Sequence, residues 1–124
     1  MQKLLSIKNK IKVLKKNKKI IGLCHGVFDV LHYGHLKHFE VAKQKCDYLF
    51  VSITSNQFIK KGLNRPINNN YQRLSFLQNL KLIDHVFIAS GESGVDSINL
   101  IKPDFYFKGN DYKNNLSDRT KKIF

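Results

Sequence analysis

The sequence is poor in cysteine, in acidic residues and in long hydrophobic runs, and each shortage excludes a class of protein. Although 42% of the 124 residues are hydrophobic, no apolar stretch approaches the roughly 20 residues of a membrane-spanning helix. A lysine-rich segment and not an apolar stretch follows Met1 to Leu5, so we expect no secretory signal peptide. The two cysteines, Cys24 and Cys46, are more typical of reduced core residues than of a disulfide. Together these absences favour a cytoplasmic protein with no membrane partner.

Acidic residues are outnumbered, with 9 Asp and Glu against 22 Lys and Arg, and the formal net charge is +13. Residues 1–19 contain eight lysines and no acid, so the remaining 105 residues carry only +5. A nucleic-acid-binding protein is expected to spread basic and aromatic residues over one face. We therefore expect no nucleic-acid partner and infer only an attraction for anionic nucleotides.

The basic N-terminal segment has a helical pattern. Apolar residues recur at helical spacing among the lysines, at Leu4, Ile7, Ile11 and Leu14, and predict an amphipathic helix over residues 1–17. We expect this helix to cover a sheet. A helix that lies on a membrane surface is the alternative.

Residues 20–38 are the stretch around which the chain is organised. The apolar run 20–24 predicts a short buried strand, and Gly26 allows a sharp exit from it. Gly34 then opens the segment 35–45, whose apolar residues suit a helix packed on a sheet. A strand, a glycine turn and a helix N-terminus together make an anion site, because free backbone N–H groups and the helix dipole meet there.

Two histidines, His32 and His35, stand at this predicted anion site. An imidazole can donate a hydrogen bond to a phosphate oxygen whether it is neutral or protonated. The stretch therefore predicts phosphate handling. His38, further along the same segment, is expected to be a solvated helix residue.

The rest of the chain alternates between strand and helix patterns, as expected for one α/β domain over residues 1–124, with the core in 18–124. Strands are predicted over 47–54, 84–89 and 104–108, helices over 71–82 and 95–101, a short turn over 56–59 and a loop over 60–70. This alternation indicates a parallel sheet with sites at the carboxyl ends of its strands.

The segment from Gly26 to His35, Gly-Val-Phe-Asp-Val-Leu-His-Tyr-Gly-His, matches the G-x-F-D-x-x-H-x-G-H signature of the cytidylyltransferase-like nucleotidyltransferases. That resemblance implies a Rossmann-like parallel sheet flanked by helices. It also implies transfer of a nucleotidyl group from a nucleoside triphosphate to a phosphorylated small molecule, with release of pyrophosphate. The closest pattern is the heptose-phosphate type, a domain often joined to a ribokinase-like sugar kinase.

Further segments resemble the same family and extend the expected site. They are Lys61-Gly62, Arg65-Pro66-Ile67, Arg73 and Lys108-Gly109-Asn110-Asp111-Tyr112. The expected catalytic residues are His32, His35 and Lys61, with the histidines stabilising charge on the phosphates and Lys61 neutralising the transferring phosphoryl group. The expected nucleotide-binding residues are Gly26, Val27, Phe28, Asp29, Gly34, Arg73, Lys108, Gly109 and Asp111.

The resemblance implies CTP or ATP as donor and a phosphorylated sugar or polyol as acceptor. A glycerol-3-phosphate cytidylyltransferase-like enzyme is an alternative. Few carboxylates are available, so Mg²⁺ is expected to be held mainly by the nucleotide phosphates. A homodimer and a fused or associated sugar-kinase domain are the expected partners. The family pattern continues beyond Phe124, which leaves a catalytically weak nucleotide-binding module as a further alternative.

A metal cluster is the competing interpretation of the histidines. Its ligands would be His25, His32, His35 and His38, with Cys24. Zinc helices usually present ligands at i and i+4, as in H-E-x-x-H, whereas here the spacing is three and no acidic base follows. Zinc is therefore less favoured. Two smaller alternatives also stay open: Asp29 as a brace of the turn, and Lys60 with Lys61 as an ordinary charged loop.

Overall fold

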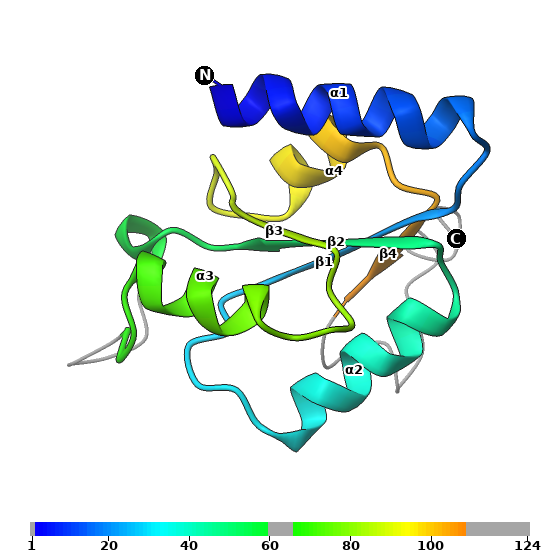
Figure 1. Ribbon diagram of the computed structural model, residues 1–124. Coiled ribbons are helices and arrows are strands. Elements are labelled where there is room, and N and C mark those ends of the chain that lie inside the picture. Colours follow the sequence, from blue (N-terminus) through cyan, green and yellow to red (C-terminus); the bar gives the residue numbers. More distant parts are fainter. Residues whose placement is uncertain (1, 60–65, 109–124) are drawn as a thin grey trace.

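The computed structural model describes residues 2–59 and 66–108, in which strands and helices alternate along the chain (Figure 1). The elements are α1 (Gln2–Lys16), β1 (Ile21–Gly26), α2 (Tyr33–Gln44), β2 (Tyr48–Ile53), the 3-10 turn η1 (Asn56–Phe58), α3 (Asn70–Gln78), β3 (His85–Ile88), α4 (Val95–Ile101) and β4 (Phe105–Phe107). None of these helices is both long and apolar enough to cross a membrane.

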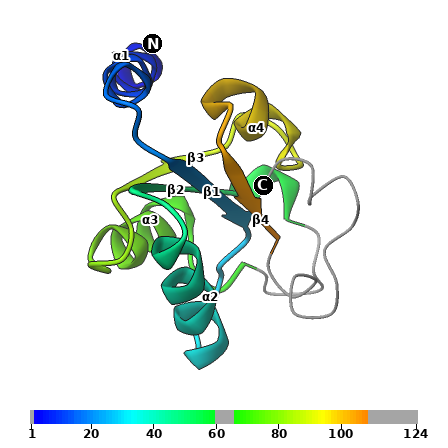
Figure 2. The same cartoon turned by 90° about the vertical axis from the view of Figure 1, so that its right-hand side faces the viewer.

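The four described strands form one sheet in the order β3-β2-β1-β4, and every neighbouring pair is parallel. Helices α1 and α4 cover one face of the sheet, and α2 and α3 cover the other (Figures 1 and 2). The predicted α/β fold with a parallel sheet flanked by helices is confirmed.

Both faces of the sheet are buried, so its central strands are almost continuously apolar. In β1, Ile21 and Leu23 join the cluster under α1 and α4, whereas Cys24 belongs to the cluster under α2 and α3. All five residues from Leu49 to Ile53 of β2 are fully buried. The side-chain alternation of a strand thus supplies both hydrophobic layers from one short segment.

Helix α1 packs against the core through the apolar face that its sequence predicts. Ile7, Ile11 and Leu14 are buried beside Ile101 of α4 in the second cluster. The helix has no acidic residue in its first turn and ends in two lysines. Tertiary packing of this apolar face, rather than helix propensity, accounts for most of the stability of such an element.

Three of the scarce acidic residues tie the beginnings of the strands together. Asp47 accepts a hydrogen bond from the Ile20 amide at 2.7 Å, Asp84 accepts from Leu49 at 2.8 Å, and Asp104 accepts from Ile21 at 2.8 Å. Each aspartate directly precedes a strand and accepts from an amide within one residue of the start of the neighbouring strand. The aspartates therefore satisfy donors that the sheet ladder leaves open.

The boundaries of several elements differ from the sequence prediction. Helix α2 begins at Tyr33 because His32 caps it, and β1 runs on to Gly26. Helix α3 ends at Gln78, short of the predicted 71–82, although the apolar spacing continues. The leucines beyond its end, Leu80 and Leu82, pack against the core from a turn.

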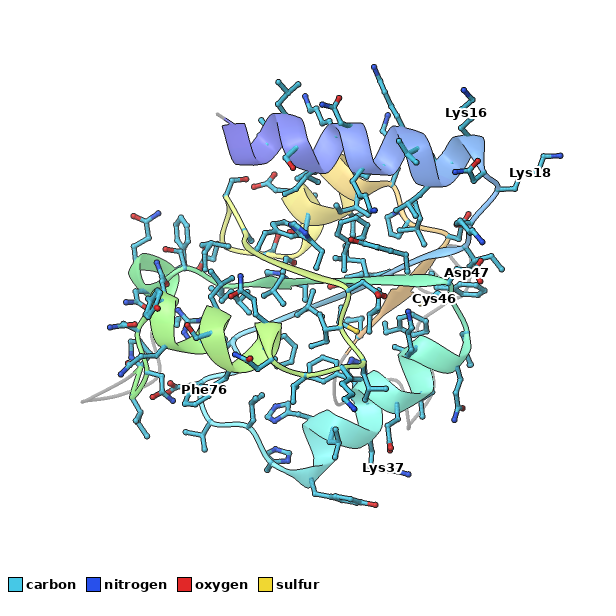
Figure 3. All side chains as sticks on the ribbon, viewed as in Figure 1. Lys16, Lys18, Lys37, Cys46, Asp47 and Phe76 are labelled. Atoms are coloured by element: carbon cyan, nitrogen blue, oxygen red, sulfur yellow. The ribbon has the colours of Figure 1, made fainter. Side chains whose placement is uncertain are left out.

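Neighbouring residues of α3 provide a test of this packing. Leu77 is fully buried, whereas Phe76 is 53% exposed and points away from the body (Figure 3). We expect Leu77→Ala to lower the free energy of unfolding by about 2–5 kcal/mol, because it leaves a cavity. Phe76→Ala should change it by no more than about 0.5 kcal/mol. Urea denaturation checks both, and equal losses in the two variants would contradict the placement of α3.

Candidate functional site

The candidate site lies at the point in the sheet where the helices that connect the strands pass from one face of the sheet to the other. The β1-to-β2 connection carries α2 on one face, and the β3-to-β4 connection carries α4 on the other (Figure 2). Strands β1 and β4 are neighbours, with Cys24 opposite Phe107. In open parallel sheets the crevice beyond the carboxyl ends at such a switch point is the usual ligand site. The signature follows β1 at this crevice, and Lys108 follows β4.

His32 and His35 cap the N-terminus of α2 reciprocally. Nδ1 of His32 accepts a hydrogen bond from the Gly34 amide at 3.0 Å, and Nδ1 of His35 accepts one from the His32 amide at 3.2 Å. Their ring centroids lie 4.0 Å apart. The two histidines thus take the places that Ser/Thr and Glu/Gln usually occupy in a capping box.

The capping bonds determine which nitrogen carries the proton. A neutral imidazole that accepts a hydrogen bond at Nδ1 carries its hydrogen on Nε2. Burial and the neighbouring His32 both lower the pKa of His35, so that ring is neutral near pH 7. In its neutral form each histidine therefore presents one N–H donor from Nε2.

The groups that the structure leaves available at this end of α2 differ from those expected for the predicted anion site. The amides of His35 and Leu36 bond to the carbonyl of His32, and the Gly34 amide bonds to its ring. These first-turn donors are therefore taken, and the imidazoles stand in their place. A hydrogen bond accepted at Nδ1 polarises the ring and strengthens the donor at Nε2. An anion at this end of α2 would therefore meet the two imidazoles in place of these amides.

Close packing explains the aromatic residue and the glycines of the signature. Phe28 has a left-handed backbone with φ of 50°, and its ring lies 5.5 Å from that of His35 and 5.3 Å from that of Phe39. A Cβ on Gly26 would come within 2.9 Å of the Phe28 ring, and one on Gly34 within 2.7 Å of the His32 ring. The side chain of Phe28 is therefore part of the core, and its ring packs against the ring of His35.

Asp29 braces the loop between β2 and α3. Its two carboxylate oxygens accept hydrogen bonds from the amides of Ile67 and Asn68, each at 2.8 Å. Its carbonyl accepts a further bond from the Asn68 side chain at 2.5 Å. These contacts agree with the bracing interpretation, and they commit both carboxylate oxygens to protein donors.

The structure corrects the role expected for Arg73. Its side chain is completely buried instead of reaching a ligand. The guanidinium makes five hydrogen bonds of 2.6–3.2 Å, to the carbonyls of Val27, Thr54 and Asn68 and to the side chains of Asn56 and Asn70. Burial lowers the pKa of Arg73, and the nearby Asp29 carboxylate raises it. Since a guanidinium has five N–H donors, none is left for a nucleotide.

A second polar network, which the sequence analysis missed, lies at the ends of β1 and β2. Nδ1 of His25 lies 2.7 Å from Oγ of Ser52, and Nε2 lies 3.3 Å from Oγ1 of Thr54. Burial lowers the pKa of His25. Ser52 inside an otherwise apolar strand is the signal that sequence reasoning could have used. Because the ring of His25 bonds to these hydroxyls, it helps to hold the strand ends beside the signature.

His38 is not the solvated residue that the sequence suggested. It is only 5% exposed, and it forms a hydrogen bond with the backbone of Phe107 in β4. Burial, followed by the effect of His35, lowers its pKa to about 4, and that hydrogen bond opposes the shift. His38 therefore joins α2 to β4 as a neutral core residue.

The other predicted site residues divide between two groups. Lys108 is the last residue that the structure describes and follows β4 directly. Lys61, Gly109 and Asp111 lie outside the described residues, as do Lys60, Gly62 and Arg65. Within residues 2–59 and 66–108, no group of three His, Cys, Asp or Glu side chains could hold a metal ion.

Comparisons with known proteins show the family of this chain. A family model described as cytidylyltransferase-like matches residues 23–124. The bifunctional protein HldE of Campylobacter jejuni (strain RM1221) is 39% identical over 115 residues, which cover 89% of this chain and 25% of that protein. HldE of a Nitratiruptor species is 39% identical over 104 residues, which cover 82% of this chain and 22% of that protein. The chain spans about a quarter of the length of these relatives.

A solved structure extends the similarity to the fold. The lipopolysaccharide core biosynthesis protein from Thermoplasma volcanium GSS1 superposes with a TM-score of 0.65 and 26% sequence identity. The match covers 71% of this chain and 72% of that one. The chain is therefore similar to known proteins in fold as well as in sequence.

The five bonds of Arg73 predict a large effect on stability. Arg73→Met should lower the free energy of unfolding by about 3 kcal/mol or more, because buried acceptors on several segments lose their donors. Arg73→Lys should recover little, since an ammonium has only three donors and no planar fork. Tyr71→Ala, at a 75% exposed position on the same helix, is the control and should be nearly neutral. Chemical denaturation measures all three, and a stable Arg73→Met variant would contradict this role.

The burial of His38 predicts a loss of stability in acid. The unfolded chain takes up this proton near the ordinary pKa of 6.5, whereas the folded protein resists protonation down to about 4. Stability should therefore fall as the pH drops through this window, by up to roughly 3 kcal/mol. His38→Gln cannot titrate, so its denaturation midpoint should depend less on pH. An unchanged pH profile in that variant would contradict the assignment.

Proposed function

Because the chain belongs to the cytidylyltransferase-like family, whose enzymes are nucleotidyltransferases, we propose that it transfers a nucleotidyl group between small molecules. The donor is CTP or ATP, and the acceptor is a phosphorylated sugar or polyol. The products are an NDP-linked compound and pyrophosphate. The observation that carries this proposal is the reciprocal capping of His32 and His35, which prepares two N–H donors at the switch point of the sheet.

In the proposed reaction an oxygen of the acceptor phosphate attacks the α-phosphorus of the nucleotide in line. A new P–O bond forms there as the bond to the departing pyrophosphate breaks, with no covalent enzyme intermediate. Such a transfer needs alignment of the reactants and stabilisation of charge on the phosphate oxygens. His32 and His35 donate from Nε2 to those oxygens.

The remaining residues have positioning or binding roles in this proposal. Lys61 neutralises the transferring phosphoryl group and the acceptor phosphate, and Lys108 with Gly109 and Asp111 binds the nucleotide. Arg73 acts indirectly, because it holds the backbones of Val27, Thr54 and Asn68 at the edge of the crevice.

We also propose that Mg²⁺ binds together with the nucleotide. The described residues offer no cage for it, since both carboxylate oxygens of Asp29 already accept backbone hydrogen bonds. The triphosphate itself would provide most of the ligands, as is common for Mg²⁺. Bound there, the ion would offset the charge of the departing pyrophosphate.

The relatives support a further part of the proposal. They are named bifunctional proteins and are about four times as long as the segment that matches this chain. We place a sugar-kinase activity beside this domain, in the same protein or in a partner, as the source of the phosphorylated acceptor. Among acceptors we favour a heptose phosphate, because the motifs resemble that type. We also propose that the reaction takes place in the cytoplasm, where nucleoside triphosphates are available.

Pyrophosphate release tests the proposed function directly. The chain is incubated with CTP or ATP and a panel of heptose, hexose and glycerol phosphates, and released pyrophosphate is measured. We expect release only when a nucleotide and its matching acceptor are present together. Nucleotide binding without release for any pair would contradict the proposed activity.

The two capping histidines allow helix capping to be separated from phosphate binding. Asp is a good N-cap residue, and Glu fits the third position of a capping box. Both carboxylates accept the amide bonds but have no hydrogen to donate, so His32→Asp and His35→Glu should keep the cap and lose the N–H donor. Loss of one preorganised donor typically lowers turnover by about 10²–10³. We expect losses of this size in kcat, with little change in melting temperature.

Lys37→Gln, on the exposed side of α2 (Figure 3), is the matched control and should retain normal turnover. Steady-state kinetics with the active substrate pair provides the comparison. Normal kcat in both histidine variants would remove the proposed phosphate role. Melting at a much lower temperature would mark the pair as structural.

A further inference from the structure

The solvent side of α1 combines basic and apolar side chains. Leu5, Lys8, Lys12 and Lys16 follow the spacing of three and four residues that aligns them along one face of a helix. Val13 flanks this row. All five are exposed, Leu5 by 60% and Val13 by 53%. We call these five residues the lysine face of α1.

This face is separate from the packing surface of the helix. Ile7, Ile11 and Leu14 already secure α1 to the core. Lys15 and Lys10, which lie beside that surface, have structural contacts with the carbonyl of Lys102 and the ring of Tyr48. The lysine face therefore has no evident part in holding the fold together.

Within residues 2–59 and 66–108, the structure gives Lys8, Lys12 and Lys16 no ion pair and no hydrogen bond. Lysines four residues apart on a helix repel one another and destabilise it. No acid in residues 1–19 offsets this charge. Lys16 and Lys18 extend away from the body at the end of α1 (Figure 3). The concentrated charge is thus open to a large anionic partner.

We propose that the lysine face of α1 docks the protein on an anionic phospholipid surface. Clusters of four to eight basic residues on an amphipathic helix attract acidic headgroups, and the three lysines of this face reach that number together with the exposed Lys18 at the end of α1. The exposed Leu5 and Val13 can enter the headgroup region beside the lysines, as apolar residues of interfacial helices do. Residues 1–19 contain neither arginine nor an aromatic residue, and nucleic-acid sites typically rely on both. A lipid surface therefore fits the face better than DNA or RNA.

The orientation that follows leaves the candidate site uncovered. Helices α1 and α2 lie on opposite sides of the sheet, so a protein docked through α1 would turn the N-terminus of α2 away from the surface (Figure 1). Docking would hold the protein near the membrane without blocking the crevice. The proposal does not rest on the nucleotidyltransferase activity and can fail independently of it.

Sedimentation with lipid vesicles tests the proposal on the whole chain. Vesicles of phosphatidylcholine alone are compared with vesicles that also contain phosphatidylglycerol, at low and at high salt. We expect the protein to pellet only with the anionic vesicles and to be released by salt, because exposed charges are screened. Absence of pelleting with anionic vesicles at low salt would overturn the proposal.

Two triple variants with the same change in charge locate the contact. The triple variant Lys8→Gln, Lys12→Gln and Lys16→Gln should bind the anionic vesicles about 100-fold more weakly. Each lysine near an acidic surface raises the partition coefficient between vesicle and water by about fivefold. Lys37, Lys45 and Lys81→Gln, at exposed positions outside α1, should have a much smaller effect. Circular dichroism should show both triples folded. Equal losses in the two triples would mean attraction by net charge alone and would overturn the assignment to α1.

Two further measurements address the apolar residues and the competing partner. Leu5→Gln combined with Val13→Gln should weaken vesicle binding several-fold while every lysine is kept. Duplex DNA added at equal phosphate concentration should leave the protein on the vesicles. Displacement by the DNA would overturn the lipid assignment in favour of nucleic acid.

Discussion

The buried guanidinium of Arg73 is the interaction on which the geometry of the candidate site depends. From the first turn of α3 it reaches the backbone after β1, the end of β2 and the loop before its own helix. Those segments are far apart in the sequence, and hydrophobic contact alone would not set their relative positions. A planar fork with five directional donors does so, and its burial is tolerable because every donor has an acceptor.

The signature uses the helix terminus in an unusual way. Small polar residues normally cap a helix and leave its remaining amides for an anion. Here imidazoles cap α2, and the amides of Gly34, His35 and Leu36 are already bonded. An anion at this end of α2 would therefore meet the second nitrogens of the two rings, which make no capping bond. Phe28 supports one of those rings, and Gly26 and Gly34 leave the room that this packing needs.

The acidic residues and the lysines of the chain occupy different parts of the structure. Asp29 braces a loop of the site, and Asp47, Asp84 and Asp104 tie the beginnings of the strands, so nearly half of the nine acids make specific bonds to backbone amides. Lysines, by contrast, gather on the outside of α1, where the fold does not need them. Four acidic residues thus organise the strand beginnings and one loop, and the basic excess is available to anionic partners.

The sequence by itself determined the α/β class, the parallel sheet and the place of the signature, because apolar periodicity and glycine spacing are local properties. Tertiary structure alone decided that Arg73 is a buried brace and that His38 is a core residue. An arginine at the start of a helix is expected to be exposed until the carbonyls around it are known. The protonated nitrogen of each capping histidine was likewise settled only by the amides that the folded backbone directs at its ring.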